Sequence, residues 1–282
     1  MDISCLDYRL TEQERLAFDR DGYLVIEDAL EQDHVARLLS AVDRVDEEYR
    51  PRQGIDRLGR LSVRDFIGLD WEFVELVDWP KVFAKVVDIL SWNLQIYHSH
   101  LNVTPVEPPE DVNDKKLSWH QDSALLNKEL ETNPRPRISL KVAYFLTDCT
   151  EDGRGNFYII PGSHLTNDYE FPNGDRKAEV EGAMSVQVKP GTAVFFDRRL
   201  WHSVSANYWT EARRAIFYGY SYRWLRPRDD VSMDHVWDRL DPIRKQLFGN
   251  APTGCYGFTS PTDEDVPLRG WLQEHLGEEV VA

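Results

Sequence analysis

The feature that most restricts how this chain can fold is a series of short, strand-like segments that begins near residue 93. Each segment is rich in β-branched and aromatic residues, and Pro, Gly, Asn and Asp cluster between the segments. Many short strands with regular turn signals are typical of an all-β barrel or a jelly roll. The expected strands cover residues 94–104, 138–147, 156–160, 184–188, 192–197 and 213–224.

Helical patterns flank this β region. Thr11 opens a capping box, and Asp21-Gly22 marks the end of the helix that follows it. The expected order before the β region is a helix over residues 11–20, a strand at Tyr23–Ile26, an amphipathic helix over 31–49, irregular chain over 50–70 and a helical stretch from about Trp71 to Leu90.

We therefore expect a mainly β fold with flanking α-helices, in one domain over residues 1–282. The helical N-terminal part covers about residues 1–91, and the β core covers about residues 92–224. A polar tail follows over residues 225–282 and ends in a weak helix.

The net charge limits the possible partners. A formal charge of −16 repels the phosphates of nucleic acids and anionic lipids. No apolar run approaches the roughly 18 residues of a membrane helix, and the N-terminus has no basic segment followed by an apolar run. The three Cys are scattered and fit a reduced compartment. We expect a cytoplasmic monomer or homodimer that binds a small-molecule substrate, and neither nucleic acid nor membranes.

A His-x-Asp motif carries the chemical signal. On a strand, His120 and Asp122 would point to the same face, because strand side chains alternate. His202, 80 residues after Asp122, is the candidate for the second His of a 2-His-1-carboxylate set. Three ligands on one face leave positions for O2 and a bidentate 2-oxo acid, which suits Fe(II) better than structural zinc. A lone His-x-Asp triplet is common by chance, so the distal His matters.

Arg213 adds a fourth element to this pattern. It follows His202 by 11 residues and lies at the start of an expected strand. A guanidinium inside an apolar barrel is costly unless it is paired. The distal carboxylate of 2-oxoglutarate is its natural partner, which it can hold with two hydrogen bonds. The adjacent Arg214 should point the other way.

At this point the chain resembles a known family, the phytanoyl-CoA dioxygenase family of Fe(II)- and 2-oxoglutarate-dependent oxygenases. The resemblance runs from about Leu10 to Leu225, and it rests on the order and spacing of several motifs. These are Leu10-Thr11, Asp21–Ile26, Trp119–Asp122, Gly155–His164, His202–Asn207 and Arg213.

The resemblance implies a double-stranded β-helix, or jelly-roll, core. It also implies that His120, Asp122 and His202 hold the iron and that Arg213 holds 2-oxoglutarate. The cofactors would be Fe(II), 2-oxoglutarate and O2, with succinate and CO2 as products. Halogenating relatives carry a small residue in place of Asp122, so the Asp favours hydroxylation.

The chain departs from the family pattern at two positions. The family often has a Ser two residues after the distal His, and Val204 stands there, with Ser203 and Ser205 on either side. The family often has Lys-Pro where this chain has Thr104-Pro105. A compensating polar group is therefore expected, and Lys141 is the candidate, unless it faces solvent. Asn102 shares the face of Thr104 and is a further pocket candidate.

Other assignments stay open at this stage. His98 and His100 lie on an expected strand and either pack in the core or line the pocket. Two arginine clusters, at residues 52–64 and 223–228, either bind an acidic substrate or balance nearby Asp and Glu. The same triad could serve desaturation, ring closure or epoxidation. A jelly-roll binding protein without catalysis and a cupin-like metal isomerase are the rivals from other classes.

Overall fold

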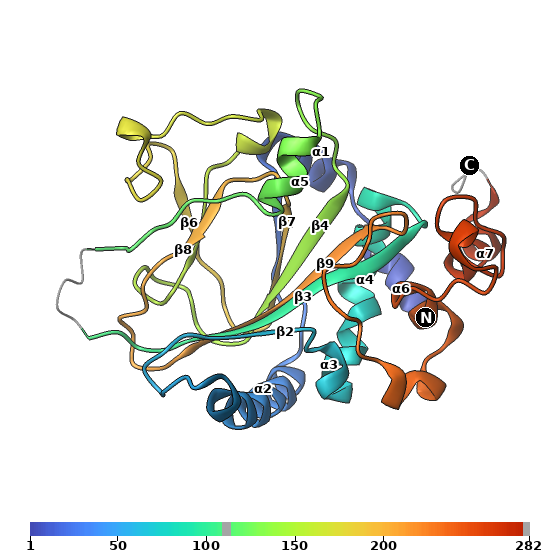
Figure 1. Cartoon of the computed structure of the whole chain (residues 1–282), viewed down its shortest axis with the longest axis horizontal. Helices are drawn as coiled ribbons and strands as arrows, with labels where there is room; N and C mark the ends of the chain where they lie inside the picture. The colour runs from blue at the N-terminus through green and yellow to red at the C-terminus, as the bar shows by residue number, and fades with distance from the viewer. Residues whose placement is uncertain (109–113, 279–282) are drawn as a thin grey trace.

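Two antiparallel sheets face one another and enclose an apolar interior (Figure 1). The structure is a computed structural model, and it describes residues 1–108 and 114–278. The strands are β1 (Tyr23–Ile26), β2 (Leu61–Arg64), β3 (Leu94–Thr104), β4 (Ser139–Phe145), β5 (Phe157–Ile159), β6 (Met184–Val186), β7 (Thr192–Asp197), β8 (His202–Val204) and β9 (Arg213–Tyr222). The larger sheet has the order β1-β7-β4-β9-β3-β2, and the smaller one has the order β6-β5-β8.

Strand β4 of the larger sheet divides its residues between two cores. On β4, Leu140, Val142 and Tyr144 face the helices and belong to the larger apolar cluster. The residues between them, Lys141 and Ala143, point into the barrel. This alternation follows from the period of two in a strand. One face of the strand therefore packs against the helices, and the other face points into the barrel.

Helices cover the outer face of the larger sheet. Tyr218 and Tyr220 of β9 point out of the barrel, and their hydroxyls donate to the carbonyls of Phe73 and Val77 at 2.8 and 2.9 Å. The helices are α1 (Glu12–Asp21), α2 (Gln32–Gln53), α3 (Trp71–Glu75), α4 (Pro80–Leu90), α5 (Ala124–Glu129), α6 (Pro242–Leu247) and α7 (Pro267–Leu276). Short 3-10 helices are η1 (Ile3–Tyr8), η2 (Ile67–Leu69), η3 (Leu76–Asp78), η4 (Ser163–Leu165), η5 (Pro172–Gly174), η6 (Asp234–Arg239) and η7 (Cys255–Phe258). None of the helices within these described ranges is long and apolar enough to cross a membrane.

The sequence predicted most of these elements. The fold class is confirmed, as are all six strands expected after residue 93 and the strand at β1. The capping box is present, with Thr11 and Glu14 bonded to each other's backbone N–H groups.

One expectation was wrong, and another is confirmed with one interruption. Residues 50–70 are not irregular throughout, because β2 forms there and pairs with β3 at the edge of the larger sheet. The helical stretch from Trp71 to Leu90 is broken at Trp79, where the chain is extended before Pro80 starts α4. Proline suits the first turn of a helix and not its interior, which accounts for the break.

Beyond β9, residues 225–232 cross the edge of the larger sheet, and we call this segment the strap. The strap begins where β2 leaves the first part of β3 unpaired. The backbone N–H of Arg228 donates to the Tyr97 carbonyl at 2.6 Å, and Ser232 donates to Asp65 beyond the end of β2. The strap therefore covers the free edge of β3, which an exposed sheet would otherwise offer to another chain.

Candidate metal centre

His120, Asp122 and His202 come together at one end of the barrel. One ligand atom from each lies within 4.8 Å of the other two. Asp122 and His202 are buried, whereas His120 is exposed. The donor set, two imidazoles and one carboxylate, is the set that non-haem ferrous enzymes use. These three residues were singled out from the sequence, and the structure brings all three together.

The local backbone differs from the expectation. His120 and Asp122 are not on a regular strand, because His120 forms a single β-bridge to His202 and Asp122 lies in a bend. The N–H groups of His120 and His202 donate to each other's carbonyls at 3.0 Å. The Asp122 N–H donates to the carbonyl of Arg198, also at 3.0 Å. This pairing, and not strand alternation, sets the geometry of the three ligands.

Both imidazoles are held in the tautomer that a metal requires. Nδ1 of His120 donates to the Ser118 carbonyl at 3.0 Å, and Nδ1 of His202 donates to the Leu200 carbonyl at 2.8 Å. Nε2 of each ring is then unprotonated and carries a free lone pair. Burial, followed by the neighbouring His120, lowers the pKa of His202 to about 3, so its imidazole is neutral at ordinary pH.

Lys141 lies beside the carboxylate. Its Nζ donates to Oδ1 of Asp122 at 2.8 Å, and the side chains are 4% and 8% exposed. Burial by itself raises the pKa of Asp122, but Lys141 and His202 outweigh it, so the pKa lies below its usual range. Oδ2 of Asp122 is buried without any partner. The carboxylate is thus charged and oriented, with one oxygen left for a metal ion.

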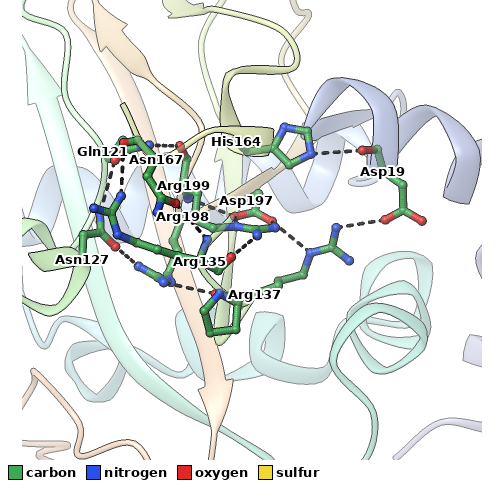
Figure 2. A network of polar contacts seen from close by, with 11 residues as sticks. Asp19, Gln121, Asn127, Arg135, Arg137, His164, Asn167, Asp197, Arg198 and Arg199 are labelled. Atoms are coloured by element: carbon green, nitrogen blue, oxygen red, sulfur yellow. Dashed lines mark hydrogen bonds and ion pairs between the residues drawn. The ribbon is translucent and has the colours of Figure 1, made fainter. Parts of the chain in front are cut away.

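A polar network joins the two segments that carry the candidate ligands (Figure 2). Asn127 of α5 donates to the Asp122 carbonyl at 3.0 Å and accepts from Arg198. Gln121 donates to the carbonyl of Arg199. The side chain of Arg199 binds Asp197, which also accepts from Arg137 at 2.9 Å. The turn before His202 and the segment after His120 are therefore fixed to each other.

A second set of unsatisfied groups lies deeper in the barrel. Arg213 of β9 and Thr104 of β3 are direct cross-strand partners, and both are 2% exposed. Nε and Nη2 of Arg213 and Oγ1 of Thr104 have no hydrogen-bond partner among the described residues. Burial lowers the pKa of Arg213 to about 10, which leaves the guanidinium charged at neutral pH. A carboxylate group fits these three donors.

Aromatic rings line the interior between the two sets. Phe196 lies 5.0 Å from His202 and Phe157 lies 5.4 Å from it, measured between ring centroids. The guanidinium carbon of Arg213 lies 5.0 Å from the centre of the Phe145 ring and 5.8 Å from that of Phe217. All four rings belong to the core cluster of the barrel. A small ligand between the triad and Arg213 would be shielded from water.

The other candidates take different positions. Asn102 shares the barrel face with Thr104 and is half-buried opposite Ala215. His98 and His100 share that face, and His98 binds Asp229 of the strap at 3.0 Å. Val204 packs against the barrel core, whereas Ser203 accepts from the Ser118 N–H and so supports the segment before His120.

Sequence reasoning missed several residues that support the centre. They are Asn127, Arg198 and Asp229, together with the pairing of Lys141 with Asp122. The arginine pair Arg198-Arg199, next to the distal His and in an apolar stretch, was the available signal, because buried arginines need partners. Nothing in the sequence points to Asp229, whose role depends on the path of the strap.

Comparison with known proteins agrees with this geometry. The family model described as phytanoyl-CoA dioxygenase matches residues 18–215. The ectoine dioxygenase of Bordetella parapertussis is 25% identical to this chain over 233 residues. The match covers 73% of each of the two chains. HygX from Streptomyces hygroscopicus, solved with nickel and 2-oxoglutarate, has a TM-score of 0.63 at 17% identity, over 78% of this chain and 90% of its own.

A further solved structure, EctD from S. alaskensis with 2-oxoglutarate and 5-hydroxyectoine, has a TM-score of 0.60 at 23% identity. The match covers 77% of this chain and 78% of the EctD chain. These likenesses confirm the jelly-roll fold. The family match extends over most of the chain and over the segments that carry His120, Asp122, His202 and Arg213. The chain therefore belongs to the phytanoyl-CoA dioxygenase family of Fe(II)- and 2-oxoglutarate-dependent dioxygenases, as its sequence predicted.

Proposed function

We propose that this enzyme hydroxylates a small organic molecule at a centre formed by His120, Asp122 and His202. The observation that carries the proposal is the convergence of these three side chains with their metal-facing atoms free. Oδ2 of Asp122 is buried without a partner, and both imidazoles use Nδ1 for a backbone carbonyl. A buried carboxylate oxygen without a partner would otherwise be unsatisfied at considerable cost.

Different residues would bind the metal and its co-substrate. Fe(II) and 2-oxoglutarate supply the chemistry that activates O2, which no side chain can provide. His120, Asp122 and His202 would hold the metal on one side. Arg213 and Thr104 would hold the distal carboxylate of 2-oxoglutarate. Asn102, which is half-buried on the same face, would contribute to the wall of this pocket.

Lys141 has a supporting role in this scheme. Its hydrogen bond to Oδ1 keeps Asp122 ionised and leaves Oδ2 directed to the metal. Among the cofactor-binding residues suggested by the sequence, Lys141 is thus assigned to the metal side of the site. The alternative that it faces solvent is wrong, because it is 3% exposed.

The carboxylate ligand supports hydroxylation over halogenation, since Asp122 occupies the position that a halide needs. Desaturation, ring closure and epoxidation use the same ligands, so substrate positioning decides among them. We also propose that residues 1–282 form one domain, since β1 and β2 of the N-terminal part belong to the same sheet as the β core. A monomer or homodimer in the cytoplasm remains our prediction.

Anaerobic absorption spectroscopy tests the assignment. Fe(II) followed by 2-oxoglutarate should produce a weak visible charge-transfer band that requires both components. His202→Ala and Asp122→Ala should lose the band because they lack a metal ligand. A normal band, or full succinate release, in the His202→Ala protein would rule out the proposed centre.

A further inference from the structure

A cavity of about 330 Å³ lies between α5 and the strap. Its apolar part comes from Leu125 and Leu126 of α5 and from Leu225 at the start of the strap. Tyr97, Ser123, Arg226 and Arg228 complete the lining. The cavity therefore has an apolar side and a basic side, and both arginines come from the strap.

One lining residue connects the cavity to the segment of the proposed metal ligands. Ser123, which follows Asp122 in sequence, lines it, and its hydroxyl lies 3.4 Å from that of Tyr97. Tyr97 precedes His98, which faces the barrel, and a bulge in β3 lies at this point. A Cβ on Gly219 would lie 3.1 Å from the Tyr97 ring and 2.8 Å from the His98 carbonyl. Because Gly219 has no side chain, the bulge of β3 at Tyr97 and His98 fits against β9.

The two cavity arginines have no acidic partner within residues 1–108 and 114–278, although acidic residues outnumber basic ones by 49 to 33. Two other arginines of the same sequence clusters have partners of their own. Arg52 pairs with Glu48 at 2.5 Å, and Arg223 is buried against the carbonyls of Asp265 and Asn250. Charge balance at the surface explains Arg52 but not Arg226 and Arg228.

The backbone of the strap is fixed to β3, and the side chains of Arg226 and Arg228 are exposed on it. Asp229 accepts hydrogen bonds from the backbone N–H and the hydroxyl of Ser99 at 2.6 and 2.7 Å, and it binds His98. The Arg228 N–H is bonded to Tyr97. The positive charge of Arg228 makes a small contribution, after burial, Lys141 and His98, to the lowered pKa of His100.

We propose that the substrate is an organic anion with an apolar body, a proposal that rests on the proposed function. Its carboxylate or phosphate group lies against Arg226 and Arg228, and its apolar body fills the cavity next to Asp122. Guanidinium groups bind both kinds of anion with paired hydrogen bonds. The strap would then set both the charge preference and the orientation of the substrate toward the metal.

Calorimetry on the enzyme loaded with Fe(II) and 2-oxoglutarate without oxygen tests this proposal. The probes are 3-phenylpropionate, phenyl phosphate and the neutral 3-phenylpropionamide. We expect at least one anion to bind, the amide not to bind, and the absorption band to persist, since 2-oxoglutarate stays in place. The better anion identifies the carboxylate or the phosphate as the preferred group.

Arg228→Gln should weaken binding of that anion by about tenfold or more, because a charge-assisted hydrogen bond is lost. Arg57→Gln is the matched control, since Arg57 is exposed, has no ion pair in the described chain and lies outside this cavity. Equal binding of the amide, unchanged affinity in Arg228→Gln, or no binding of either anion would overturn the proposal. Absence of the absorption band in the unmodified enzyme would instead reject the proposed function.

Discussion

Lys141 and Asp122 form an ion pair inside the barrel, with Nζ and Oδ1 2.8 Å apart. The pair spans the gap between β4 and the segment that carries two of the proposed metal ligands. Lys141 balances the negative charge of the carboxylate without a metal ion, and it occupies only one of the two oxygens. The apo protein therefore tolerates a charged metal ligand in a buried position.

Replacement of Lys141 by Met should make the stability of the protein depend on metal. Removal of one partner of a buried ion pair costs about 3–5 kcal/mol, so the ligand-free variant should be less stable than the unmodified protein by a few kcal/mol. A divalent ion supplies the missing positive charge. Thermal denaturation should show a larger metal-induced rise in Tm for Lys141→Met than for the unmodified protein. Lys128→Met, at an exposed lysine of α5, should leave both values unchanged.

The strands could be predicted from the sequence because they depend on local rules, and the candidate ligands could be predicted from the order and spacing of their motifs. Alternation with period two and turn residues place β3, β4, β7 and β9 correctly. The order of His120, Asp122, His202 and Arg213 suggested one site, and register brings Arg213 opposite Thr104. The roles of these residues remain predictions that the experiments above address.

What could not be predicted depends on contacts between distant segments. The partner of Lys141 is decided by how the segment after Trp119 crosses the barrel, and not by the sequence around Lys141. The same holds for β2, whose four residues become a strand only because β3 offers a free edge. The sequence of the strap likewise shows no helix or strand pattern. Its path depends on hydrogen bonds to Tyr97, Ser99 and Asp65.

Replacement of Arg213 by Met should separate co-substrate binding from metal binding. The variant loses the cation for the distal carboxylate, so the concentration of 2-oxoglutarate needed for the absorption band should rise about a hundredfold or more. Metal affinity should not change. The ligand-free protein should be at least as stable as before, because an unpaired buried charge has been removed.

Arg214→Met is the control for this prediction. Arg214 points to the helix side and binds Asp43 at 2.9 Å. Its loss should leave the 2-oxoglutarate titration unaltered. If both variants weakened the binding of 2-oxoglutarate equally, the effect would come from disturbance of β9 and not from a specific contact.

Asn127 should act on the metal through Asp122. Asn127→Ala removes the bond to the Asp122 carbonyl and the acceptor for Arg198. Loss of a group that positions a metal ligand typically lowers affinity by about 10- to 100-fold, and metal titration should show a decrease of that size. Asn167→Ala removes bonds to Arg135 and Thr132 in the same network, far from the ligands along the chain. It should lower stability but preserve metal affinity (Figure 2).

Asp197 should be the largest single polar contributor to stability in that network. Its side chain is fully buried, and it accepts from Arg199 at 2.6 and 2.8 Å and from Arg137 at 2.9 Å. Asp197→Asn leaves both arginines without their carboxylate. The free energy of unfolding should fall by about 3–5 kcal/mol at pH 7, as measured by urea denaturation.

The pH dependence of that loss distinguishes a charge effect from a packing effect. Burial alone raises the pKa of Asp197, but the hydrogen bonds and charges of Arg199 and Arg137 outweigh it, so the pKa is lowered. A lowered pKa in the folded state adds stability above the unfolded pKa of about 3.9, and this stability is lost as the pH falls through the folded value. The difference between the unmodified protein and Asp197→Asn should therefore be constant from about pH 8 to 5 and shrink below about pH 4. Asp7→Asn, at an exposed carboxyl, should show almost no difference throughout. A difference for Asp197→Asn that persists undiminished into acid would mean that shape, and not charge, holds Arg199 and Arg137 in place.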